Sequence, residues 1–144
     1  IRDSYTLKNL SGGDEILLAT ADFREGWFRF RRFCFNPAAL AMGKETVLAG
    51  LEDPPDLIVI DEVGPLELAG MGWHSLLQKL AIRKSIPQIW VARESVLEAV
   101  MERWKIPPGH VVRIDPRKST PARNDLLANL CENIVNLVRL NSNR

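Results

Sequence analysis

Two adjacent carboxylates that follow a short apolar run are the residues of this chain best placed to do chemistry. Residues 57–60 read Leu-Ile-Val-Ile, and Asp61 and Glu62 come next. An apolar run of this length without alternation is typical of a strand covered on both faces, as in a parallel sheet. Ligands of open α/β sheets bind beyond the carboxyl ends of the strands. The sequence therefore predicts two acids at the edge of a sheet where a ligand would bind.

Each acid has a chemical role that suits this position. An aspartate after a buried strand can hold Mg²⁺, usually through its water shell, because this hard cation prefers oxygen ligands. The glutamate beside it can orient or deprotonate an attacking water. In nucleotide hydrolases this arrangement is the Walker B element, which assigns the metal to Asp61 and water activation to Glu62. The alternative stays open that these are ordinary acidic residues at a strand end.

Arg93 follows the next buried strand predicted by the sequence, residues 89–92. Because neighbouring parallel strands end at one edge of a sheet, Arg93 is expected at the same rim as Asp61. There it would contact a terminal phosphate and stabilise its charge; a surface arginine at a strand end is the alternative. His74 and His110 have no partners at metal-ligand spacing, so a zinc site is not expected.

The apolar pattern predicts the elements that would position these side chains. Residues 5–10 and 15–20 flank Ser-Gly-Gly-Asp and predict a hairpin. Asn36-Pro37 predicts a helix start, with the helix ending before residue 53. The second half alternates between strand and helix patterns, which predicts an α/β fold with a parallel sheet and helices on both faces. The predicted strands lie at 57–60, 89–92 and 111–114, and the predicted helices lie around 73–80, from a capping box at 95–98, and from 120–121.

Residues 27–35 alternate aromatics with arginines, which predicts a strand with one solvent-exposed face. The alternation changes phase midway, so a bulge or bend is expected near residues 31–32. Arg29, Arg31 and Arg32 could hold phosphate or RNA while neighbouring aromatics stack on bases. We favour the simpler interpretation, a charged face in solvent.

Composition limits the class of protein and its partners. The 144 residues are predicted to form a single domain, 1–144, and no apolar run approaches a membrane span. The 19 basic and 18 acidic residues leave a net charge of +1, so neither nucleic acid nor an anionic membrane is expected as a partner. Cys34 and Cys131 are expected to be free, buried thiols in a reducing compartment.

The acid pair belongs to a longer pattern. Residues 56–68 read Asp-Leu-Ile-Val-Ile-Asp-Glu-Val-Gly-Pro-Leu-Glu-Leu, and Gly72-Trp73 follow. This stretch resembles a family of P-loop nucleoside triphosphatases first described from thermophiles, the THEP family. The resemblance covers most of residues 5–115, is specific at 56–73, and includes a β-hairpin region at 24–37. It implies a RecA-like P-loop fold, Mg²⁺-dependent hydrolysis of several nucleoside triphosphates, and a cytoplasmic location.

The chain departs from that family at the phosphate-binding loop. No Gly-x-x-x-x-Gly-Lys followed by Ser or Thr occurs in it. The nearest match, Gly43-Lys44-Glu45, lacks the hydroxyl and falls inside a predicted helix, so Lys44 is expected to be a solvated helix residue. Either the first strand, phosphate loop and helix precede Ile1, or the protein is a degenerate, non-catalytic binding or regulatory module.

We favour the first alternative, which carries two expectations. The 144-residue chain alone should not hydrolyse nucleotide at a useful rate. Its strand at 57–60 should have an unpaired side and exposed apolar surface, so that the chain self-associates or rearranges its sheet.

Overall fold

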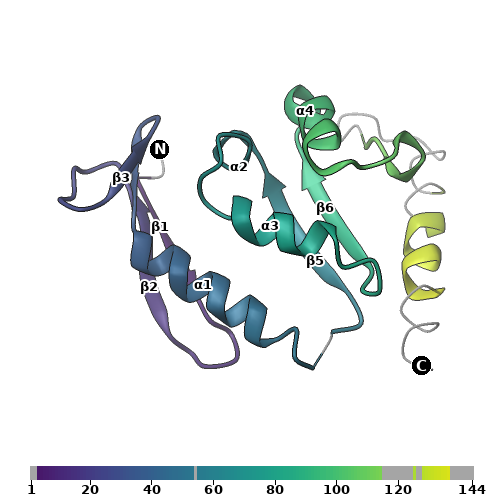
Figure 1. The fold of residues 1–144 in the computed structure, drawn as a ribbon, viewed down its shortest axis with the longest axis horizontal. Coiled ribbons are helices and arrows are strands. Elements are labelled where there is room, and N and C mark those ends of the chain that lie inside the picture. Colours follow the sequence, from purple (N-terminus) through teal and green to yellow (C-terminus); the bar gives the residue numbers. More distant parts are fainter. Residues whose placement is uncertain (1–2, 54, 115–124, 126–127, 137–144) are drawn as a thin grey trace.

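A computed structural model describes residues 3–53, 55–114, 125 and 128–136. These residues form a mixed α/β structure with one antiparallel sheet and one parallel sheet (Figure 1). In chain order the elements are β1 (Ser4–Lys8), β2 (Glu15–Thr20), β3 (Phe28–Phe30), β4 (Phe33–Phe35), α1 (Pro37–Ala49), β5 (Ile58–Val63), α2 (Pro65–Leu68), α3 (His74–Ala81), β6 (Gln88–Ala92), α4 (Glu94–Trp104) and the 3-10 helix η1 (Pro108–His110).

The antiparallel sheet has four strands in the order β1-β2-β4-β3. The pairing of β1 with β2 confirms the predicted hairpin. The single bent strand predicted at 27–35 is wrong, because β3 and β4 pair with each other around a turn at residues 31–32. Arg31 takes a left-handed conformation there, with φ of 55°. The phase change in the sequence therefore marks a chain reversal and not a bulge.

Helix α1 begins where the sequence predicts. The side chain of its N-cap, Asn36, accepts a hydrogen bond from the Ala38 N–H at 3.0 Å, and Pro37 occupies the first turn. The Asn36 amide also donates to the Leu17 carbonyl at 2.9 Å, which ties the start of α1 to β2. The helix ends at Ala49, before residue 53, as expected.

The parallel sheet has two strands among the described residues, where the sequence predicts three. Strands β5 and β6 pair in parallel, with Ile60 opposite Trp90. The strand predicted at 111–114 is wrong, since these residues follow η1 and have no regular structure. Two prolines, Pro107 and Pro108, precede this segment, and Arg113 bonds to acids of α4 instead of entering the sheet.

Helix α3 covers one face of the parallel sheet (Figure 1). Its predicted stripe of Leu76, Leu77 and Leu80 is buried and packs with residues of β5, β6 and α4. Helix α4 begins after Arg93, two residues earlier than predicted, so the expected capping box at Ser95 is wrong. The helical start follows directly from the end of β6.

Among the described residues, no element covers the other face of the parallel sheet. This is contrary to the cover predicted from the apolar runs, and it agrees with the exposed apolar surface expected if the first strand is missing. Val59 is 60% exposed and Val91 is 45% exposed. Val59 pairs with Ile89, two residues before Val91, so all three side chains share a face. Apolar surface is therefore exposed along the centre of the sheet.

Part of the predicted C-terminal helix lies within the described residues. Residues 125 and 128–136 are helical, as predicted for the C-terminal segment, with Leu130 and Ile134 half-buried; Leu127, Leu137 and Val138 of the expected apolar stripe lie outside the described residues. Cys34 is buried and free, whereas Cys131 is free but exposed, so its predicted burial is wrong. Within the described residues, no helix is both long enough and apolar enough to cross a membrane.

Candidate functional site

Strand β5 carries Asp61 and Glu62 to the carboxyl end of the parallel sheet. Both are exposed, and both lie within the strand and not after it, because β5 continues to Val63. Val63 is 2% exposed and packs with Leu77 and Val100, which anchors the strand end. The buried side chain of Val63 therefore fixes the strand end that carries the two acids, and this end lies at the sheet edge where the sequence predicts it.

The backbone at the acid pair is irregular. The pairing of β5 with β6 shifts register between Ile60 and Val63. Glu62 has φ of 58°, a left-handed conformation that costs a non-glycine residue about 1–2 kcal/mol. Strained residues of this kind cluster at functional sites, so this outlier supports a functional interpretation.

Arg93 lies directly beside Glu62. One guanidinium nitrogen of Arg93 donates to Oε1 of Glu62 at 2.8 Å. This hydrogen bond, together with the charge of Glu62, raises the pKa of Arg93. The two side chains are 74% and 67% exposed, so the ion pair adds little to stability. Its consequence is geometric: residues 31 positions apart meet at one rim of the sheet.

Asp61 remains available to a ligand. Its side chain forms no ion pair or hydrogen bond with any other residue that the structure describes. Among those residues, no group of three or more His, Cys, Asp or Glu side chains could enclose a metal. This donor set fits Mg²⁺, which keeps several waters and binds one or two carboxylates together with substrate phosphates. It does not suit an ion that requires a complete protein cage.

Glu67 is a structural residue of this region that sequence reasoning missed. It is 5% exposed, and its carboxylate accepts the N–H of Gly64 at 3.2 Å and of Trp73 at 3.4 Å. The first of these contacts is the glutamate half of a capping box at the start of α2, since Gly64 has no side chain to complete the box. A glutamate three residues after a predicted helix start was the available signal. Glu67 thereby closes the segment that follows the acid pair into a compact loop.

His74 has a structural role that excludes metal binding in this conformation. Its Nδ1 lies 2.7 Å from the backbone carbonyl of Glu67, which can only accept, so Nδ1 carries the hydrogen. Its Nε2 lies 3.1 Å from a guanidinium nitrogen of Arg103, which can only donate. Both ring nitrogens are therefore engaged within the protein.

Gly43 and Lys44 form part of the packing between helices. A Cβ on Gly43 would lie 2.6 Å from the Trp73 ring, so glycine allows α1 to approach the loop before α3. Lys44 is half-buried, and its Nζ donates to Oγ of Ser75 at 3.0 Å. The predicted placement of Lys44 inside a helix is confirmed, and its amine forms a solvent-exposed bond to Ser75 that was not predicted.

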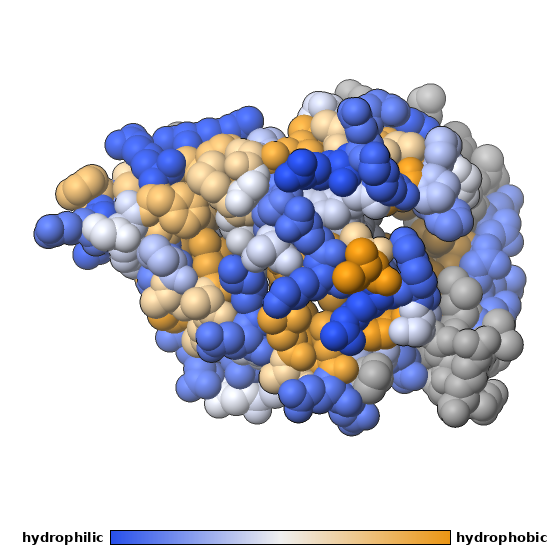
Figure 2. All heavy atoms as spheres, viewed as in Figure 1, coloured by the Kyte–Doolittle hydropathy of each residue, from blue (hydrophilic) through white to orange (hydrophobic). Residues whose placement is uncertain are grey.

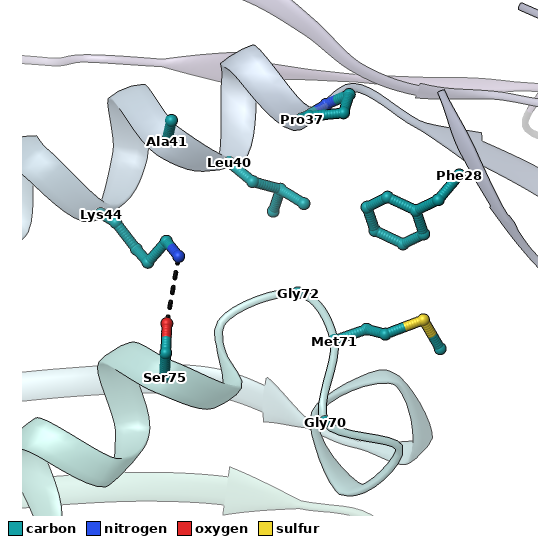
Figure 3. Close-up of a pocket in the computed structure, with 9 residues that line it drawn as sticks. All are labelled: Phe28, Pro37, Leu40, Ala41, Lys44, Gly70, Met71, Gly72 and Ser75. Carbon is teal, nitrogen blue, oxygen red and sulfur yellow. Dashed lines mark hydrogen bonds between the residues drawn. The ribbon is translucent and has the colours of Figure 1, made fainter. Parts of the chain in front are cut away.

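A hollow of about 270 Å³ lies beside this contact (Figure 3). Phe28 and Met71 point into it from opposite sides, and the bonded pair of Lys44 and Ser75 borders its other end. The hollow therefore has apolar walls and a polar end. The hollow could not be predicted from the sequence, because its sides come from β3, α1, the loop before α3 and the start of α3.

Comparisons with protein-family models, with curated proteins and with solved structures each found no match for this chain. The resemblance of residues 56–73 to the THEP family accordingly stays a hypothesis based on the motif. Any function has to be argued from the site itself.

Proposed function

We propose that this chain carries the Walker B carboxylates of a P-loop nucleoside triphosphatase with a RecA-like core, similar to the THEP family. The reaction is Mg²⁺-dependent hydrolysis of a nucleoside triphosphate to the diphosphate and phosphate. The observation that carries the proposal is the exposed pair Asp61 and Glu62 at the carboxyl end of a parallel strand, with Arg93, directly after the next strand, 2.8 Å from Glu62.

Each side chain has one role in this proposal. The free carboxylate of Asp61 holds Mg²⁺ through its water shell, and the ion when bound offsets phosphate charge. Glu62 orients the attacking water and accepts its proton as the terminal phosphorus–oxygen bond to the diphosphate breaks. Arg93 has five N–H donors, so its guanidinium can contact Glu62 and a phosphate oxygen together. That placement keeps a positive charge where negative charge develops.

The proposal also requires a phosphate-binding loop from outside these 144 residues, since they contain none. The parallel sheet supports this requirement. Parallel sheets are normally covered on both faces, yet Val59 and Val91 are exposed on one face of β5 and β6. Further strands and helices would complete the sheet. In the proposed fold, one of these strands leads into the phosphate-binding loop.

A second candidate is a non-catalytic α/β binding or regulatory module. The ion pair between Glu62 and Arg93 favours it, because the guanidinium occupies one carboxylate oxygen that would otherwise be free to hold a water. In that case the acid pair would be a polar strand end with no role in hydrolysis.

Isosteric substitutions separate the two candidates. In a form of the protein that carries a phosphate loop ahead of residue 1, we expect Asp61→Asn to weaken Mg²⁺-dependent nucleotide binding and turnover together. Glu62→Gln should leave nucleotide affinity nearly unchanged and slow single-turnover hydrolysis by roughly 10²–10⁴-fold, the usual contribution of a general base. Nucleotide affinity and single-turnover rates are measured for both variants.

The 144-residue chain alone is the negative control for this experiment. Without backbone N–H groups and a lysine to hold the β- and γ-phosphates, it should release no phosphate above background. Unimpaired hydrolysis by both variants, or Mg²⁺-dependent hydrolysis by the 144-residue chain, would refute the proposed assignment.

A further inference from the structure

Five aromatic side chains lie on one face of the antiparallel sheet. Phe28 pairs with Phe35 and Phe30 pairs with Phe33, and paired residues in antiparallel strands share a face. The ring contacts agree: Phe28 and Phe35 stack at 5.5 Å, and Tyr5 meets Phe33 edge-on at 5.3 Å. None of the five is fully buried, and Tyr5 is 40% exposed. We call this surface, formed by Tyr5, Phe28, Phe30, Phe33 and Phe35, the aromatic face.

Arginines flank the aromatic face. The guanidinium of Arg31 lies 5.7 Å from the centre of the Phe30 ring, and that of Arg32 lies 4.5 Å from the Phe33 ring. Arg24, Arg29 and Arg31 form no ion pair with a carboxylate in the part of the chain that the structure describes. The positive charge of this end of the sheet is therefore available to an anionic partner.

The conformation of Arg31 is a second observation that points to a function. The first residue of this two-residue turn has φ of 55°, where glycine or asparagine is the favoured choice. An arginine in this conformation costs the fold about 1–2 kcal/mol, and such costs are typical of functional positions. This strained residue carries its guanidinium at the tip of the β3–β4 hairpin.

The hollow described above adjoins the aromatic face. Phe28 belongs to both, and Figure 3 shows its ring directed into the hollow with Met71 on the other side. Lys44 and Ser75 provide an amine and a hydroxyl at its far end. A planar base could pack between the apolar walls and form hydrogen bonds there through its edge. Figure 2 shows apolar side chains gathered over this end of the molecule, with hydrophilic side chains around them.

We propose that the aromatic face, the hairpin arginines and the adjoining hollow bind single-stranded nucleic acid. Aromatic rings stack on bases of any sequence, and arginines contact the phosphates, which is how sheet surfaces recognise single strands. The net charge of +1 gave no reason to expect this partner. The local arrangement does, because the guanidinium groups of Arg31 and Arg32 lie against two rings of the aromatic face. An anionic membrane or an acidic protein would use the arginines but has no need of partly exposed rings beside them.

The test uses the 144-residue chain and a fluorescein-labelled 12-nucleotide oligouridylate, with binding followed by anisotropy. We expect saturable binding. A plot of the logarithm of the binding constant against the logarithm of the salt concentration should have a slope near −2, which corresponds to about three phosphate contacts. Phe30→Leu keeps apolar volume and removes the ring, and should weaken binding about tenfold. The pair Arg31→Gly and Arg32→Gln should weaken it at least as much, because both guanidinium groups lie against rings of the aromatic face. Glycine at residue 31 suits the turn and preserves the hairpin.

The matched control is the pair Arg83→Gln and Lys84→Gln, which removes the same charge from an exposed segment between α3 and β6. Equal losses from the control pair and the hairpin pair would mean unspecific attraction and would overturn the proposal. Unchanged binding of the oligonucleotide by Phe30→Leu would also overturn the proposal. So would binding to duplex RNA or to phosphatidylserine vesicles that is as tight as binding to the oligonucleotide and that Phe30→Leu does not weaken. Failure here leaves the hydrolysis proposal standing, because its residues lie on the other sheet.

Discussion

Glu67 and Gly72 show how single residues shape the segment next to the acid pair. The carboxylate of Glu67 holds the amides of Gly64 and Trp73, so it lies inside the loop that joins β5 to α3. Gly72 has φ of 56°, and a Cβ there would lie 2.7 Å from Oε1 of Glu67 and 2.7 Å from Leu66. Glycine at residue 72 is therefore required both by the backbone and by the room that the carboxylate needs.

This double requirement gives a stability prediction with a matched control. Gly70 also has a left-handed backbone, with φ of 80°, but a Cβ there would meet no atom within 4 Å. Gly70→Ala should lower the free energy of unfolding by roughly 1–2 kcal/mol, the cost of the conformation. Gly72→Ala should lower it by more, about 1–3 kcal/mol beyond the control, because its methyl group displaces Glu67 or Leu66. Urea unfolding of both variants measures the difference, and equal losses would mean that the contact with Glu67 relaxes without cost.

The sequence allowed some of these residues to be predicted and not others, for a physical reason. Asp61, Glu62 and Arg93 were predictable because each follows an apolar run, and a parallel sheet brings strand ends together. The contact between Arg93 and Glu62 bears out their shared rim. The bond from Lys44 to Ser75 was not predictable, because it depends on how α1 approaches α3. No local pattern encodes the distance between two helices.

At the scale of elements, the β3–β4 hairpin shows where pattern reasoning has too little information. Phe-Arg-Phe-Arg-Arg-Phe-Cys-Phe fits one bent strand or two paired strands equally well, since both keep aromatics on a common face. Only the left-handed Arg31 separates them, and arginine gives no sign of a turn. The predicted strand at 111–114 failed for a related reason: three β-branched residues around Arg113 do not form a strand without a paired edge.

The hairpin turn gives a second stability prediction. Arg31→Gly should raise the free energy of unfolding by about 0.5 kcal/mol or more, because relief of the left-handed strain exceeds the extra freedom of glycine in the unfolded chain. Arg32→Gly should lower it, because Arg32 has no positive φ to relieve and loses its contact with the Phe33 ring at 4.5 Å. Thermal unfolding of the two variants is the measurement. Destabilisation by both would show that the turn at residue 31 is not strained.

At the scale of the whole molecule, the two sheets differ in how far their surfaces are covered. The parallel sheet packs α3 and α4 on one side with Leu77, Leu80 and Val100 almost completely buried. Its other side exposes Val59 and Val91, and each strand has one neighbour in the described structure. The sequence predicted the α/β class and the parallel pairing, because buried strands and helices alternate along the chain. The apolar runs did not predict the uncovered face, because such a run looks the same whether or not its second side is covered. The exposed surface was expected only from the absence of a phosphate-binding loop, since the strand that leads into that loop would be missing from the sheet as well.

The uncovered face predicts that the 144-residue chain self-associates. Apolar surface at the centre of a sheet and unpaired strand edges both favour contact with a second copy. Sedimentation velocity over a range of concentrations should reveal dimers or larger species. The pair Val59→Thr and Val91→Thr keeps the β-branched shape that suits a strand and lowers the apolar area, so it should weaken association about tenfold or more. Ile82→Thr is the matched control, because Ile82 is 78% exposed beyond the end of α3 and away from this face. A chain that stays monomeric at all concentrations, or one whose association the control weakens equally, would mean that the open face of β5 and β6 is not the contact surface.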